Sequence, residues 1–252
     1  MTNAPNTLQW GSIRESLREP LTRLIDGVQT PLGGRLRSVT VVGSALTDDF
    51  RPGISDVNTV IVLDEHTIAA LNAVASLAKS RRRSGLSAPL MMTAPYIERS
   101  RDVFGVEFLD FQLTHQTVLG DDPFANLRFE KRDVRLQCER ELKATLVRLR
   151  QGWVASAGDR RLVREILVAT AKGLAPLMRA MLWLRDVDRP KTMAATLTQA
   201  STRFHIDLDA AIRADRWRQE KPRLSDSDIE SAFVAIVDAV DRLAAAIDEM
   251  EP

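Results

Sequence analysis

The sequence predicts an α+β protein, in which a small mixed β-sheet domain over residues 1–125 precedes an all-α helical bundle over residues 126–252. Two apolar segments rich in β-branched residues, 38–42 and 57–63, are typical of strands and lie in the first half. After about residue 119 no strand pattern appears, and apolar residues recur at helical spacing.

The first half alternates helical and strand patterns. Apolar residues at helical spacing predict an amphipathic helix over 11–28, with a kink or break at Pro20. A Gly-Gly turn at 33–34 then leads into the strand 38–42. The other elements expected in this half, besides the strand 57–63, are a helix over 67–83 and strands over 88–93 and 103–113.

The second half is helical throughout. Its expected helices cover 129–151, 159–186, 191–204, 207–217 and 225–250. Ser225 is an expected N-cap, with Asp228 three residues later. The short connections favour antiparallel neighbours in a bundle.

Composition narrows the class of protein. A net charge of +1 gives no support for nucleic acid or an anionic membrane as a partner. The single cysteine, Cys138, excludes an internal disulfide framework and fits a reducing cytosol. The three histidines, His66, His115 and His205, are too few and too dispersed for a His-rich zinc site. With no signal-peptide pattern and no apolar run as long as a bilayer span, we expect a cytoplasmic protein.

The residues that predict chemistry lie between the two strands. Gly43 lets the chain turn sharply after the first strand, and Ser44 offers a hydroxyl where backbone donors can approach a phosphate. Asp56 stands at the start of the second strand, and strand alternation puts Asn58 on the same face. Two side-chain oxygens beside a small polar turn suit a divalent cation shared with phosphates. The alternative is that Asp56 only caps a turn.

This pattern resembles the nucleotidyltransferase superfamily, which includes polymerase-β-like and aminoglycoside nucleotidyltransferase-like domains. Gly43-Ser44, a loop, and Ser55-Asp56-Val57-Asn58 before an apolar strand are similar to that family's Gly-Ser and Asp-x-Asp motifs. The resemblance covers about residues 36–122 and implies a small mixed sheet flanked by helices, with a helical domain after it.

The resemblance implies roles for individual residues. Gly43 and Ser44 would contact nucleotide phosphates, and Asp56 would bind Mg²⁺. Asn58 falls where the family has its second metal carboxylate, so a full negative charge is missing there. The third carboxylate, expected on a later strand, is assigned to Asp110, with Glu107 as the alternative.

The implied function is transfer of a nucleoside monophosphate from a nucleoside triphosphate to an acceptor hydroxyl, with catalysis weakened at Asn58. The alternative is a degenerate relative that senses nucleotide or binds a protein. His115 is either a general base or a structural histidine. Lys172 and Arg179 either contact phosphate or substrate or lie extended at the bundle surface. The sequence leaves the acceptor and the oligomeric state, homo-oligomer included, open.

Overall fold

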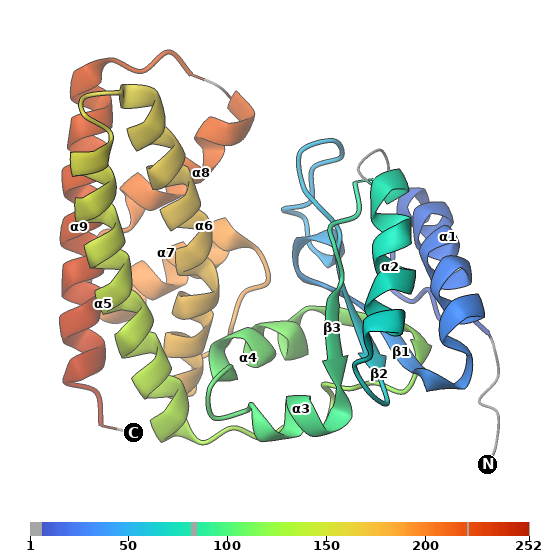
Figure 1. Ribbon diagram of the computed structural model, residues 1–252. Helices are drawn as coiled ribbons and strands as arrows, with labels where there is room; N and C mark the ends of the chain where they lie inside the picture. Colours follow the sequence, from blue (N-terminus) through green and yellow to red (C-terminus); the bar gives the residue numbers. More distant parts are fainter. Residues whose placement is uncertain (1–6, 82–84, 221, 252) are drawn as a thin grey trace. The chain divides into compact units, whose positions relative to one another are not determined.

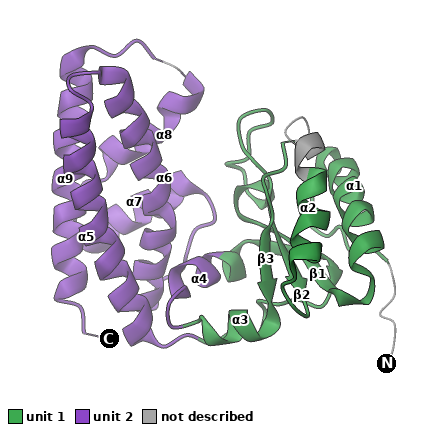
Figure 2. Cartoon of the chain, viewed as in Figure 1, with its two compact units in different colours: residues 1–101, 111–128 green, residues 102–110, 129–252 purple. Residues whose placement is uncertain are grey.

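The computed structural model describes residues 7–81, 85–220 and 222–251 (Figure 1). The chain divides into two compact units (Figure 2). The first contains residues 1–101 and 111–128, and the second contains residues 102–110 and 129–252. The segment 102–110, which we expected in the same domain as the sheet, therefore clusters with the helices.

The first unit is built on a four-stranded mixed sheet with the strand order β3-β2-β1-β4. The central strand β1 (Leu36–Val42) pairs antiparallel with β2 (Asn58–Leu63) and with β4 (His115–Gly120). The edge strand β3 (Leu90–Thr93) runs parallel to β2. The mixed sheet expected from the sequence is confirmed.

Two helices, α1 (Glu15–Leu32) and α2 (Ile68–Arg81), lie side by side against the sheet (Figure 1). Val39, Val41 and Ile61 are buried on the face that these helices cover, in one apolar cluster with residues of α1. Alternation along a strand then turns Val42 and Asn58 toward the opposite face.

Short helical turns complete the first unit. η1 (Gly33–Arg35) precedes β1, and η2 (Gly43–Leu46) follows it. The helix α3 (Ala94–Arg99) starts directly after β3, with the Thr93 hydroxyl accepting a hydrogen bond from the Tyr96 amide.

The strand expected over 103–113 is wrong, because this segment forms the helix α4 (Gly105–Leu113). The segment is a short run made mostly of apolar residues, and such runs do not distinguish strand from helix. In the fold, Val106 and Leu109 are buried one turn apart on one helix face. Gln137 Oε1 accepts the Val106 amide hydrogen bond at 2.9 Å, which satisfies a donor of the first turn. The fourth strand of the sheet is His115–Gly120.

The second unit is a bundle around α6 (Arg160–Leu184), which packs against each of the other long helices. These are α5 (Lys131–Ala155), α7 (Met193–Phe204), α8 (Asp209–Glu220) and α9 (Asp226–Asp248). Ser225 and Asp228 form the expected capping box at the start of α9.

α6 is long and apolar enough to cross a membrane by length and composition alone. In this unit, however, 56% of its most apolar window is buried among the other helices. That burial is what a central bundle helix requires.

Candidate functional site

Strand pairing places several polar residues at one end of the sheet. Val42, the last residue of β1, is directly opposite Asn58 on β2 and His115 on β4. Directly opposed residues of paired strands share a face of the sheet. Asn58 and His115 therefore flank the end of β1 on the same face, two strand spacings or about 10 Å apart.

Gly43 and Ser44 lie between these two residues, where β1 runs into η2. Gly43 has φ +77°, a conformation that costs a residue with a side chain about 1–2 kcal/mol. Its amide donates to the Thr114 carbonyl at 2.9 Å, which ties the turn to the start of β4. The first amides of a 3₁₀ turn have no partner within it, so η2 presents donors at the end of β1.

Asp56 lies just before β2 with its side chain exposed. The neighbouring Val57 is buried, and its amide donates to the Gly85 carbonyl at 2.8 Å, which fixes the chain on either side. The turn is closed by Ser55, whose hydroxyl accepts the Arg51 amide at 3.1 Å and whose own amide donates to the Arg51 carbonyl. Within the described part of the chain, the Asp56 carboxylate has no hydrogen-bond or ion-pair partner. Turn formation thus does not use this carboxylate.

Asn58 is held by a second side chain, Ser87. The Ser87 hydroxyl lies 2.8 Å from Asn58 Oδ1 and 3.2 Å from the Val57 carbonyl. A side chain added at Gly43 would have its Cβ 4.0 Å from Asn58 Nδ2, so the amide nitrogen faces the turn. In this arrangement the Asn58 oxygen is occupied by Ser87, and the group aimed at Gly43 is a donor. That suits a phosphate oxygen better than a cation.

The hydroxyl of Ser87 carries one proton, so it donates to one of its two acceptors at a time. When it donates to the Val57 carbonyl, a rotated Asn58 amide donates to the hydroxyl and turns its oxygen toward Gly43. The Ser87 contact thus allows two orientations of Asn58, one that favours an anion and one that favours a cation.

His115 forms a dyad with Asp122 at the other side of the turn. His115 Nε2 lies 2.8 Å from Asp122 Oδ2, and Nδ1 lies 2.9 Å from the Phe111 carbonyl, which only accepts. Burial opposes the charge of Asp122, but hydrogen bonds from His115 and from the Phe124 and Ala125 amides lower the pKa of Asp122 overall. Both ring nitrogens face acceptors, so the structure gives His115 a positioning contact and no free nitrogen for a general base.

Asp110 lies on α4, in the second unit, and not on a strand of the sheet. The expectation that a strand carries it is therefore wrong. Its carboxylate accepts a hydrogen bond from Arg179 Nη1 at 2.5 Å, with side chains 18% and 9% exposed. Arg179 Nε also donates to the Pro190 carbonyl at 3.1 Å, and Arg189 donates to the Leu109 carbonyl at 3.1 Å. These contacts explain how a charged residue is accommodated in an apolar helix.

Glu107, the alternative third carboxylate, is also on α4. It accepts a hydrogen bond from Gln137 Nε2 at 2.6 Å, and its side chain is exposed. Across the described ranges, no three His, Cys, Asp or Glu side chains gather in a way that could hold a metal ion. The residues that the sheet does bring to one end are Gly43, Ser44, Asn58 and His115, and Asp56 lies two residues before Asn58.

Sequence reasoning missed the partners of the site residues. Asp122 accepts two backbone amides, as a turn-forming residue does, but the sequence gives no signal of its contact with His115. Ser87 has no local signal, because it follows the turn at Gly85 and meets Asn58 from 29 residues away. Arg179 was a candidate phosphate contact, and its partner in the structure is Asp110.

No family model matches the chain, and no curated protein matches it. Among solved structures, the chain is similar to spectinomycin adenyltransferase AAD(9) from Enterococcus faecialis, determined with ATP and spectinomycin. The identity is 11%, the match covers 88% of this chain and 98% of that chain, and the TM-score is 0.53. The chain therefore has an aminoglycoside nucleotidyltransferase-like fold with a helical C-terminal region.

Proposed function

We propose that this protein transfers a nucleoside monophosphate from a nucleoside triphosphate to an acceptor hydroxyl. The acceptor oxygen forms a bond to the α-phosphorus, and the bond from that phosphorus to the bridging oxygen breaks. Pyrophosphate leaves with the bond's electron pair, and the hydroxyl proton passes to water or a carboxylate. Such transfer depends on positioning and on neutralising phosphate charge more than on covalent chemistry by the protein.

The observation that carries the proposal is the Asp56 carboxylate, exposed and without a partner in the described structure, two residues before Asn58, whose amide faces the turn at Gly43. A chain that used Asp56 only for local structure would pair it with a backbone amide, as it does with Ser55. The structural neighbour supports the same reading at a coarse level, since its structure was determined with ATP and an acceptor.

The donor set fits one Mg²⁺ that is shared with the nucleotide. Asp56 would hold the ion together with phosphate oxygens, which is an ordinary arrangement for Mg²⁺. When bound, the ion would offset the negative charge of the phosphates. A second ion held by protein carboxylates does not fit, because Asn58 is neutral where a second carboxylate would be needed.

A catalytic role for Asp110 is a separate part of the proposal and is tested apart from Asp56. It needs its own test because the ion pair with Arg179 is sufficient to explain why this carboxylate is mostly buried. Asp110→Asn keeps the shape and removes the charge. Loss of turnover with unchanged affinity for nucleotide would support a catalytic Asp110, whereas equal turnover would leave it a structural residue.

The deciding experiment is calorimetric titration with each nucleoside triphosphate, with and without Mg²⁺. The wild-type chain is compared with Asp56→Ala and with Asp26→Ala, which removes an exposed carboxylate from α1. We expect Mg²⁺-dependent binding that Asp56→Ala abolishes and Asp26→Ala leaves unchanged. Absence of binding by every triphosphate would refute the proposal.

A nucleotide-sensing or protein-binding module is the second candidate, favoured by the contact between Ser87 and Asn58. In that case the fold binds nucleotide but turns it over weakly. Binding that ignores Mg²⁺, together with no release of pyrophosphate, would favour this second function over transfer.

A further inference from the structure

The helical unit contains a pocket of about 700 Å³ between α6 and α8. Small-molecule sites span about 300–1,000 Å³, so this volume suits a compact organic ligand. All its lining residues belong to the second unit. None of them is among the sheet-end residues that carry the proposed function.

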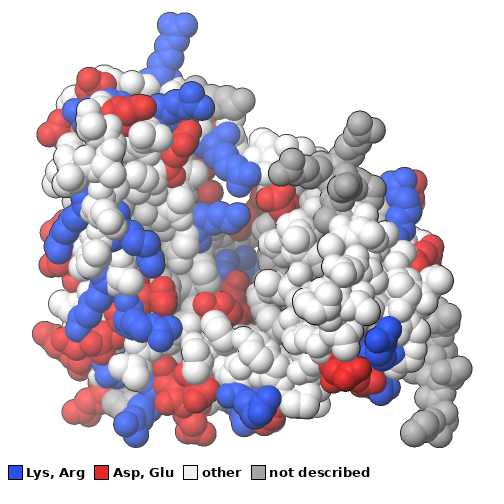
Figure 3. All heavy atoms as spheres, in the orientation of Figure 1, with Lys and Arg blue, Asp and Glu red and all other residues white. Residues whose placement is uncertain are grey.

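The pocket has more positive than negative side chains. Its acidic members are Glu165 and Asp215, and its cationic members are Arg161, Arg164, Lys172 and Arg218. On the face drawn in Figure 3, positive and negative side chains of the helical unit are mixed, as the net charge of +1 leads one to expect. The excess of cations in one pocket departs from that mixed pattern.

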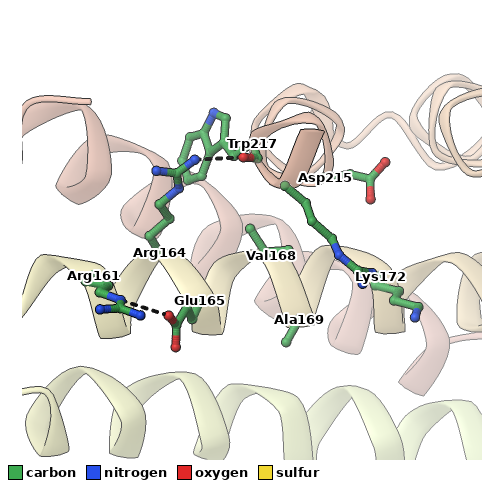
Figure 4. Close-up of a pocket in the computed structure, with 9 residues that line it drawn as sticks. Arg161, Arg164, Glu165, Val168, Ala169, Lys172, Asp215 and Trp217 are labelled. Atoms are coloured by element: carbon green, nitrogen blue, oxygen red, sulfur yellow. Dashed lines mark hydrogen bonds and ion pairs between the residues drawn. The ribbon is translucent and has the colours of Figure 1, made fainter. Parts of the chain in front are cut away.

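Arg164 is positioned without being neutralised. Its Nη2 donates to the Trp217 carbonyl at 2.7 Å, so a neutral group holds the guanidinium in place (Figure 4). Lys172 is exposed. In the described ranges, neither Arg164 nor Lys172 has a carboxylate within ion-pair distance. Arg161, by contrast, pairs with Glu165 at 3.3 Å, in a contact so exposed that it contributes little.

The two unneutralised cations stand at either end of an apolar floor. Arg164, Val168 and Lys172 follow one another at intervals of four residues along the same face of α6 (Figure 4). Eight residues of helix separate Arg164 from Lys172 by about 12 Å. Val168, Ala169 and the mostly buried Trp217 provide apolar surface in this pocket.

From this arrangement we infer that the α6–α8 pocket binds a small organic anion with an apolar or aromatic body. The anionic group, a phosphate or a carboxylate, pairs with Arg164 or Lys172, and the body lies on Val168 and Trp217. Arg164 suits either group, because a guanidinium forms two parallel hydrogen bonds with carboxylates and with phosphates.

The test uses three compounds that share a naphthalene ring and differ in the charged group attached to it. The full chain is titrated by calorimetry with 2-naphthyl phosphate, 2-naphthoate and 2-naphthylmethylamine, without nucleotide or Mg²⁺. We expect both anions to bind and the ammonium compound not to bind. The anion that binds with the lower Kd shows whether the pocket prefers a phosphate or a carboxylate.

Variants locate the site. Lys172→Gln removes an exposed charge and is expected to weaken anion binding about tenfold, the effect of losing one charged hydrogen bond. Arg164→Gln is expected to weaken it at least as much, with urea unfolding used to show that the variant is folded. Arg213→Gln is the matched control, because it removes an exposed charge from α8 outside the pocket.

Three results would overturn the inference: equal binding of the ammonium compound, no binding of either anion at millimolar concentration, or equal weakening by Lys172→Gln and Arg213→Gln. Because nucleotide and Mg²⁺ are absent from the titration, its failure leaves the proposed transfer untouched. Likewise, a failure of nucleotide binding in the Asp56 experiment would not contradict anion binding in this pocket.

Discussion

Asp110 and Arg179 form an ion pair in the helical unit, with Asp110 Oδ1 2.5 Å from Arg179 Nη1 and both side chains mostly buried. They lie 69 residues apart in sequence. The pair joins α4 to α6, and the same guanidinium also donates to the carbonyls of Pro190 and Lys191. It therefore holds three segments of the second unit together.

Removing the carboxylate of this pair should destabilise the protein. We expect Asp110→Ala to lower the free energy of unfolding by about 3 kcal/mol, because it leaves the buried Arg179 charge without the carboxylate that neutralises it. Asp110→Ala combined with Arg179→Met should recover part of that loss. Urea unfolding measures both. Asp241→Ala breaks the exposed pair with Arg150 and serves as the control, with an expected effect below about 1 kcal/mol. Equal effects of Asp110→Ala and Asp241→Ala would contradict this view.

Asn58→Asp should restore a charged ligand beside Asp56. We expect it to tighten Mg²⁺-dependent nucleotide binding by about tenfold or more, because hard divalent ions prefer charged oxygens. Calorimetry with and without Mg²⁺ checks this, and Asn58→Ala is the control that removes the side chain without adding charge. If Asn58→Asp binds nucleotide no better than wild type, Asn58 does not lie beside the bound ion.

Gly43→Ala should cost about 1–2 kcal/mol of stability because of its backbone conformation. The position has φ +77°, but the added Cβ would meet no atom closer than 4.0 Å, so the cost is strain and not a clash. Gly173→Ala is the matched control, since it lies in α6 with open space around it and should stabilise by up to about 1 kcal/mol. A neutral Gly43→Ala would show that the turn relaxes freely.

The dyad of Asp122 and His115 should contribute to acid sensitivity. The pKa of Asp122 is lowered from 3.8, so its contribution to stability is present above that value and is lost as the pH falls through the lower folded pKa. Asp122→Asn should remove this contribution and flatten the fall in stability with acid. Urea unfolding from about pH 6 to about pH 2 compares the two chains. Parallel curves would mean that Asp122 titrates alike in the folded and unfolded chains.

Cys138 should be unreactive in the native protein. Burial raises the pKa of its thiol, with Glu107 and Glu141 adding to the effect, and the side chain is fully buried on α5. Only the thiolate reacts with disulfide reagents. We expect labelling at about pH 8 to be slow in buffer and rapid in denaturing urea. Rapid labelling of the native chain would show that the second unit opens locally.

The sequence by itself determined the elements whose signals are local. The β-branched segments at 38–42 and 57–63 became β1 and β2, and Ser225 with Asp228 formed a capping box within four residues. Gly43 marks a turn because its φ is unfavourable for any residue with a side chain. Backbone sterics and neighbouring side chains decide such features, so a short stretch of sequence contains the information.

Tertiary structure alone decided which distant side chains pair with the polar residues, and whether the segment 103–113 is a strand or a helix. The apolar segment 103–113 is a helix and not the expected strand, because burial of Val106 and Leu109 and the Gln137 contact favour that form. Asn58 meets Ser87 and Asp110 meets Arg179 from 29 and 69 residues away. The packing of the helices and strands decides which distant side chain forms a hydrogen bond with a given polar group. That packing is favoured when buried polar and charged groups have partners.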